Sequence, residues 1–86
     1  MNVVKKIYTD GRVEEVSEKM GLDELQKFVG GYIEMVPTTI PHRALVVNEE
    51  GELNGLPPNP EATKLVHPQT LMGPDGIKGN ALLVKN

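Results

Sequence analysis

The chain is predicted to fold as a small α+β domain with a mainly antiparallel sheet, and three observations carry this prediction. Two β-rich segments near the amino terminus are joined by Asp10-Gly11, a pair typical of tight hairpins. Residues 22–29 have helical periodicity and end at a glycine pair. Two more β-rich segments, a short helical turn and a last apolar strand follow. The predicted order is therefore ββαββαβ, with one helix and a short second helix.

The first two strands are predicted at residues 2–8 and 12–16. An Asp-Gly pair between two β-rich runs favours a two-residue turn, because both central residues of such a turn need positive φ. With that turn, Tyr8 would face Val13 across the hairpin, which is a compatible cross-strand pair.

The middle of the chain predicts a helix between two hairpins. In residues 22–29, the apolar side chains Leu22, Leu25, Phe28 and Val29 share one face, and two acidic residues in the first turn favour the helix dipole. Gly30 is expected to end this helix in the left-handed conformation. Strands are predicted at residues 31–36 and 43–48, joined by a loop with two prolines. The continuous apolar run 44–47 indicates a central strand that is buried on both faces.

The last part of the chain predicts a short helix and a closing strand. Asn59 followed by Pro60 is a typical helix start, and Pro68 stops the helix. Pro74-Asp75-Gly76 is predicted to turn the chain into a final strand at residues 77–84.

Composition restricts the classes of protein that this chain fits. Eighty-six residues predict a single domain, residues 1–86, and the net charge of −3 is spread along the chain without a basic run. This pattern argues against duplex nucleic acid as a partner. No segment reaches the roughly 20 apolar residues of a membrane span. The absence of cysteine excludes disulfides and thiol catalysis, and with no signal-peptide pattern it favours a cytoplasmic protein.

No residue pattern demands catalysis, a metal or a cofactor, so the chain is predicted not to be an enzyme. Ser17 is the only serine, and His42 and His67 each lie beside a proline with no nucleophile at a useful spacing. Residues 50–61 resemble a calcium-binding loop. They begin with Glu instead of Asp, follow a predicted strand and contain Pro57, so a solvated turn is the preferred interpretation.

The junction Gly30-Gly31-Tyr32 is the first candidate for a binding site. The two glycine N–H groups could face a ligand, and the Tyr32 ring could stack on a base. The alternative is a helix C-cap followed by a tight turn, with Tyr32 packed against the sheet.

The second candidate combines Asn48 with the start of the short helix. Free N–H groups at this helix start could seat an anion, with Asn59 at its cap and Thr63 one turn inside. The alternative is that the Asn59 side chain satisfies these groups itself. Because the chain is acidic, an anionic ligand would need local cations, and Arg43 and Lys64 are the nearest candidates.

These residues carry a family resemblance over nearly the whole chain. The segments are VGGYIE at 29–34, NEEG at 48–51, LPPN with a following Ala-Thr at 56–63, and a closing Ile-x-Gly at 77–79. This pattern resembles a family of small domains of unknown function that is common in bacteriophages and other mobile elements of bacteria. The chain has Asn80 where the family pattern has Asp. The resemblance implies a cytoplasmic accessory protein of a phage and supplies no catalytic residue.

The leading functional hypothesis is a non-enzymatic binding protein that captures a nucleotide-like small molecule, such as a host-defence signal. Its expected ligand-binding residues are Gly30, Gly31, Tyr32, Arg43, Asn48, Asn59, Thr63 and Lys64. A homo-oligomer with the site at a subunit interface is compatible with this hypothesis. The alternative is a protein–protein inhibitor of a host factor that uses an exposed strand edge or the loop 37–42.

Overall fold

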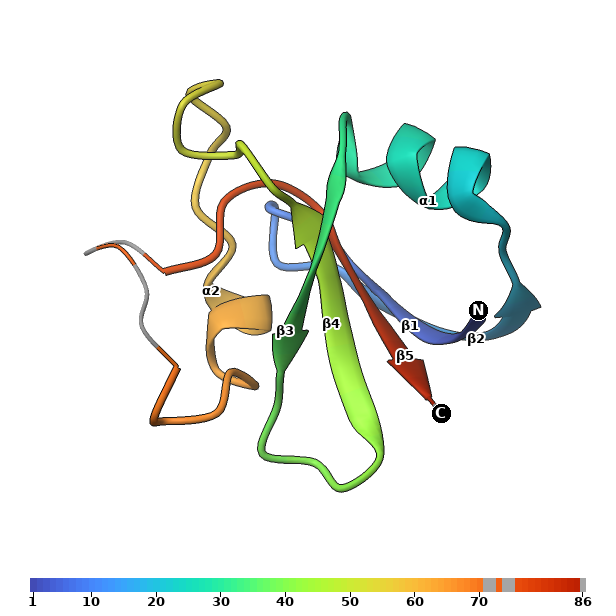
Figure 1. Cartoon of the computed structure of the whole chain (residues 1–86). Helices are drawn as coiled ribbons and strands as arrows, with labels where there is room; N and C mark the ends of the chain where they lie inside the picture. Colours follow the sequence, from blue (N-terminus) through green and yellow to red (C-terminus); the bar gives the residue numbers. More distant parts are fainter. Residues whose placement is uncertain (71–72, 74–75, 86) are drawn as a thin grey trace.

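The structure is a computed structural model, and it describes residues 1–70, 73 and 76–85. Five strands form one antiparallel sheet in the order β2-β1-β5-β4-β3 (Figure 1). The strands are β1 (Asn2–Ile7), β2 (Val13–Lys19), β3 (Ile33–Pro37), β4 (Arg43–Asn48) and β5 (Ala81–Lys85), and the helices are α1 (Leu22–Val29) and α2 (Pro60–Thr63). The α+β class and the ββαββαβ order predicted from the sequence are confirmed.

The last strand, β5, lies between the two hairpins and joins them into one sheet. Leu82 faces Lys6 of β1 on one side and Val46 of β4 on the other. Because both neighbours cover it, β5 is buried along almost its whole length, as β4 is. The predicted burial of the run 44–47 is confirmed for residues 45–47, and Ala44 is partly buried.

The closing strand is shorter than the predicted segment 77–84. Its first residues leave the sheet because they pair with the segment that leads into α2. The Asn59 N–H donates to the Ile77 carbonyl at 2.8 Å, and the Gly79 N–H donates to the Pro57 carbonyl at 2.8 Å. Of the turn predicted just before, Pro74 and Asp75 lie outside the described residues.

Each face of the sheet carries one hydrophobic cluster. The cluster under α1 consists of Val3, Met20, Leu25, Val29, Val46, Leu82 and Val84. The cluster under α2 consists of Ile7, Val36, Leu45, Val47, Ala62, Val66, Ile77, Ala81 and Leu83. The two helices therefore cover opposite faces (Figure 1). Leu22, predicted to share the buried face of α1, is 57% exposed and does not belong to this cluster.

The amino-terminal hairpin has a different register from the predicted one. The Tyr8 N–H donates to the Arg12 carbonyl, so Tyr8 faces Arg12, and Ile7 faces Val13. The turn holds three residues instead of two, because the Asp10 carboxylate accepts the Arg12 N–H and Gly11 has a φ of 93°. A glycine in this conformation is typical of three-residue hairpin loops.

Tyr8 is expected to make the stability of the hairpin depend on pH. Its hydroxyl donates a hydrogen bond to the Glu14 carboxylate, which raises the pKa of Tyr8, and burial and the Glu14 charge act in the same direction. Because the pKa is raised on folding, this contribution is present below the unfolded value of about 10 and is lost as the pH rises through the folded pKa.

Tyrosine absorbance measures this effect directly. In a Tyr32→Phe background Tyr8 is the only tyrosine, so the absorbance change reports the ionisation of its phenol alone. Adding Glu14→Gln should move the midpoint pH of this change towards the ordinary tyrosine pKa. An unchanged midpoint would show that Glu14 does not control the phenol.

Candidate functional site

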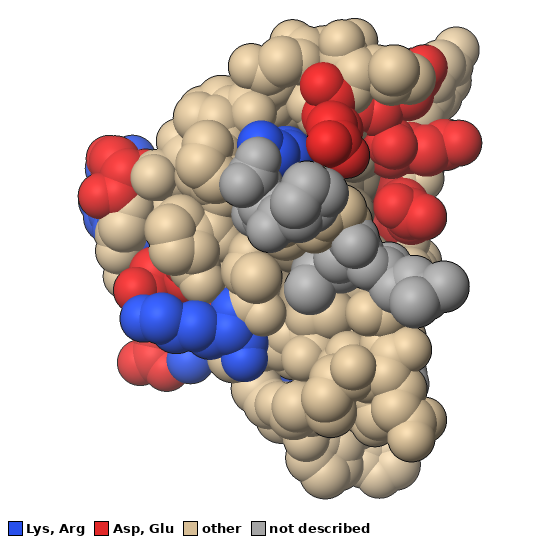
Figure 2. All heavy atoms as spheres, turned by 90° about the vertical axis from the view of Figure 1, so that its left-hand side faces the viewer, with Lys and Arg blue, Asp and Glu red and all other residues tan. Residues whose placement is uncertain are grey.

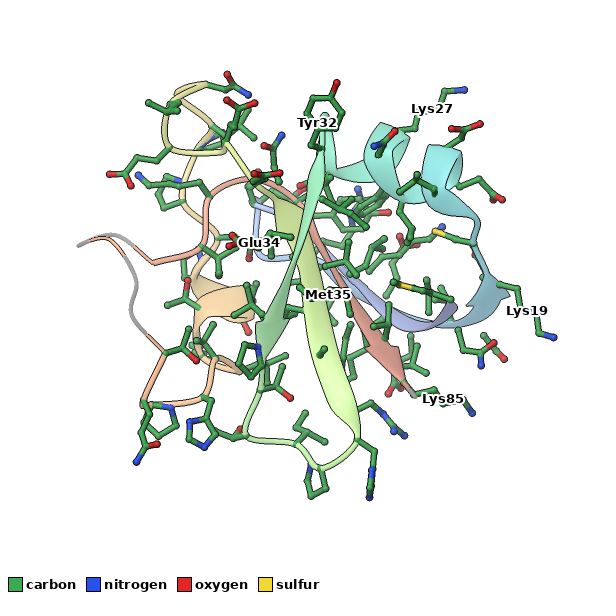
Figure 3. The ribbon with its side chains drawn as sticks, viewed as in Figure 1. Lys19, Lys27, Tyr32, Glu34, Met35 and Lys85 are labelled. Atoms are coloured by element: carbon green, nitrogen blue, oxygen red, sulfur yellow. The ribbon has the colours of Figure 1, made fainter. Side chains whose placement is uncertain are left out.

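A polar pocket lies at the end of the sheet where α1 passes into β3 and β4 passes into the following loop. Its volume is about 390 Å³. Its lining consists of Gln26, Gly31, Tyr32, Asn48, Glu50 and Asn54. Tyr32 immediately precedes β3, and its side chain points away from the sheet (Figure 3). We refer to this site as the Tyr32 pocket.

The Asn48 side chain connects the end of α1 to the loop that follows β4, on two sides of the pocket. Its side-chain amide donates to the Val29 carbonyl at 3.1 Å and accepts from the Glu50 N–H at 2.8 Å. An added Cβ at Gly31 would lie 3.0 Å from the Asn48 amide nitrogen, so glycine allows this close approach. Asn48 is only 6% exposed. Its side chain therefore positions the walls, and the predicted reading of a ligand edge by this amide is not supported by the geometry.

The glycine pair also has a structural role. The N–H groups of Gly30 and Gly31 both donate to the Gln26 carbonyl, at 2.8 and 3.0 Å, and Gly30 has a φ of 87°. The predicted left-handed C-cap of α1 is thereby confirmed. A phosphate could reach these N–H groups only if the cap opened, so the alternative interpretation of this junction fits better than a phosphate seat.

Tyr32 is the group of the pocket that is most available to a ligand. Tyr32 is 70% exposed, and its hydroxyl has no hydrogen-bond partner among residues 1–70, 73 and 76–85. Its carbonyl accepts the Glu49 N–H at 2.8 Å, which fixes the backbone where the ring begins. The predicted alternative, packing of Tyr32 against the sheet, does not agree with this exposure.

The predicted anion seat at the short helix is occupied by Asn59 itself. This residue is fully buried, and its side-chain oxygen, Oδ1, accepts the Ala62 N–H at 3.1 Å. Its amide nitrogen donates to the carbonyls of Ile7 at 3.1 Å and Gly79 at 2.9 Å. The Thr63 hydroxyl donates to the backbone carbonyl of Asn59 and accepts the Ile77 N–H. Asn59 and Thr63 thus connect α2 to the core instead of facing a ligand.

The two predicted cations are also separate from the Tyr32 pocket. Arg43 begins β4, whereas Asn48 ends it, and the Arg43 guanidinium donates to the His42 carbonyl at 3.2 Å. The Lys64 ammonium, at the C-cap of α2, pairs with Glu61 at 2.9 Å. Neither residue lines the pocket, whose described lining holds one carboxylate and no Lys or Arg. The eight predicted residues therefore lie in three separate regions. Gly30, Gly31, Tyr32 and Asn48 lie at or beside the Tyr32 pocket, Asn59, Thr63 and Lys64 lie at α2, and Arg43 begins β4.

Three lining residues were absent from the predicted set. Gln26 lies on α1 one turn before the glycine pair, and Glu50 belongs to the NEEG segment that carries the family resemblance. In the sequence, Asn54 belongs to the segment 50–61 that resembles a calcium-binding loop. Within the described residues, no group of three His, Asp or Glu side chains is placed to hold a metal ion.

The fold and the pocket define a small α+β domain with an open polar site at one end of its sheet. The chain belongs to a family described as Domain of unknown function (DUF3846), whose model matches residues 2–86. No curated protein matches the chain, and no solved structure matches it. The helices of the described part of the chain are too short to traverse a bilayer.

Proposed function

We propose that this protein is a non-enzymatic binding protein that captures a nucleotide-like small molecule at the Tyr32 pocket. The observation that carries the proposal is the exposed Tyr32 ring at the rim of a polar pocket. Stacking of a base on an aromatic side chain contributes about 1–3 kcal/mol and accepts different bases. The amides of Gln26 and Asn54 have donors and acceptors that match the polar edges of a base.

The charge of the pocket favours one orientation of such a ligand. Glu50 is a hydrogen-bond acceptor, which suits the hydroxyl groups of a ribose and repels a phosphate. In the proposed complex, the base and the sugar therefore enter the pocket and the phosphates face solvent. Added phosphates are expected to weaken binding or leave it unchanged.

The biological role that we propose rests on the resemblance of the VGGYIE and NEEG segments. A phage or another mobile element would encode the protein, which would act in the cytoplasm of the host. There it would remove a nucleotide signal of host defence without changing it chemically. This role needs tight binding and no catalytic group.

A thermal-shift screen against nucleosides, linear and cyclic nucleotides and ADP-ribose derivatives tests the proposal. A ligand at 100 times its Kd should add about 2.7 kcal/mol of stability, which shifts the Tm of a domain this small by several degrees. Tyr32→Ala should abolish the shift, whereas Tyr32→Phe, which keeps the ring, should retain it. Leu22→Ala removes another exposed apolar side chain, outside the pocket, and serves as the matched control.

Recovery of the ligand distinguishes capture from catalysis. After denaturation, a captured ligand should be released chemically unchanged and in stoichiometric amount. A converted ligand would contradict the non-enzymatic part of the proposal. The absence of a thermal shift with every compound in the screen would contradict the capture of a nucleotide-like molecule. An equal shift in wild type and Tyr32→Ala would contradict the assignment of the site to the Tyr32 pocket.

The second candidate function is inhibition of a protein partner. Of the two surfaces predicted for it, the loop 37–42 is held in place, because the Thr38 hydroxyl donates to the Arg43 carbonyl at 2.8 Å and the Thr39 N–H donates to the Leu65 carbonyl. The sheet has two edge strands, β2 and β3. The edge of β3 favours this candidate, because its first residues have backbone groups that point outwards without a partner in the described part of the chain.

A further inference from the structure

The outer edge of β3 has backbone groups that point away from the sheet. The Glu49 N–H donates to the Tyr32 carbonyl, and with the antiparallel register this places the backbone groups of Glu34 and Val36 towards β4. The N–H and C=O groups of Ile33 and Met35 therefore point outwards. Within the described part of the chain, these outward groups have no hydrogen-bond partner.

Only the first part of β3 is open in this way. Towards its end, the His67 N–H donates to the outward Pro37 carbonyl at 3.0 Å, and Thr38 pairs with Val66. The opposite edge of the sheet, β2, carries several exposed charges, which is how proteins commonly block edge pairing. The open stretch Ile33–Met35 carries Glu34 as its one charged side chain.

An acidic hollow lies beside this open stretch, on the α2 face of the sheet. Its volume is about 240 Å³, and its lining includes Glu34, Glu49 and Glu52 together with Lys78. Acidic side chains gather on the upper right of this face of the molecule (Figure 2). Side chains alternate along β3, since Ile33 packs in the α1 cluster and Val36 in the α2 cluster. A strand added to β3 would therefore place every second side chain on the α2 face, the face that carries Glu34.

We propose that the β3 edge binds an extended, basic segment of a partner protein, which adds a strand to the sheet. The partner backbone would pair with Ile33 and Met35, and its Lys or Arg side chains would lie beside Glu34 and Glu52. Charge complementarity selects this occupant. A second copy of this chain would bring the same acidic surface against itself, and like charges across a strand pair are destabilising.

Fluorescence anisotropy with short labelled peptides tests the proposal. The probe is a peptide of about six residues, a usual strand length, with alternating Lys and Val. A matched peptide with Glu in place of Lys is expected to bind at least about tenfold more weakly, and salt should weaken the Lys peptide. Glu34→Gln should reduce both the affinity for the Lys peptide and its dependence on salt.

Met35→Pro separates strand addition from simple charge attraction. The Met35 N–H points away from β4, so proline removes an outward donor and leaves the sheet bonds in place. We expect Met35→Pro to weaken binding of the Lys peptide by about tenfold or more, because a backbone bond is lost and the ring obstructs the added strand. Met35→Val keeps the N–H and is the matched control, and circular dichroism verifies that both variants fold.

Three outcomes would overturn this inference. They are equal binding of the Lys peptide to Met35→Pro and Met35→Val, equal binding of the Lys and Glu peptides, and a wild-type dimer that becomes a monomer in Met35→Pro. The third would identify a second copy as the occupant. Met35 does not line the Tyr32 pocket, so thermal shifts with nucleotides should be the same in Met35→Pro. The two proposals can therefore fail independently.

Discussion

Replacement of Asn59 by alanine is expected to lower the free energy of unfolding by about 3–5 kcal/mol. The side chain of Asn59 is fully buried and makes three hydrogen bonds, to the Ala62 N–H and to the carbonyls of Ile7 and Gly79. Alanine leaves these three buried groups without their partner and opens a cavity among them. For a domain of this size, the Tm should fall by roughly 20 °C.

Urea unfolding followed by circular dichroism measures this loss. Asn54→Ala is the matched control, because it removes the same chemical group from an exposed position that makes no side-chain hydrogen bond with a described residue. We expect the control to remain within about 0.5 kcal/mol of the parent. If the two variants lost similar stability, Asn59 would not connect α2 to the core as described.

Replacement of Asn48 by alanine is expected to cost about 2–3 kcal/mol and to weaken ligand capture. The Asn48 amide bonds the carbonyl at the end of α1 and the N–H of Glu50, so its loss frees two walls of the Tyr32 pocket at once. A more mobile site loses more conformational entropy when a ligand binds, and this lowers the affinity. The thermal shift caused by a nucleotide should therefore be smaller as well.

Asn80→Ala provides a graded comparison for Asn48. Its side chain accepts one hydrogen bond, from the Thr9 N–H at 3.1 Å, and it lies outside the Tyr32 pocket. We expect a loss of about 1 kcal/mol in stability and an unchanged nucleotide shift. An unchanged shift in Asn48→Ala would show that Asn48 supports the fold alone.

Local signals in the sequence predicted most of the fold. The left-handed cap at Gly30 and the cap at Asn59 depend on neighbouring residues, and both are found where they were expected. The apolar run 44–47 indicated a strand covered on both faces, and this holds for residues 45–47 because β4 lies between β3 and β5. The hairpin register was wrong because the turn pattern does not show that Asp10 binds the Arg12 N–H.

The arrangement of the candidate site could not be predicted in the same way. Asn59 bonds the carbonyl of Ile7, which is 52 residues away in the sequence, and no local pattern indicates this contact. The same residue types that favour ligand binding also form caps and turns, so Gly31, Asn48 and Thr63 satisfied both interpretations. Only the three-dimensional structure shows which polar groups are already bonded and that the Tyr32 ring is exposed.

The most direct test of the proposed function is amide chemical-shift mapping by NMR with the nucleoside or nucleotide that gives the largest thermal shift. Our account predicts that the perturbed amides cluster around the Tyr32 pocket, at Gln26, Gly31, Tyr32, Glu50 and Asn54. Perturbations centred on α2 or on Arg43 would contradict it, and so would a spectrum that no member of the panel changes.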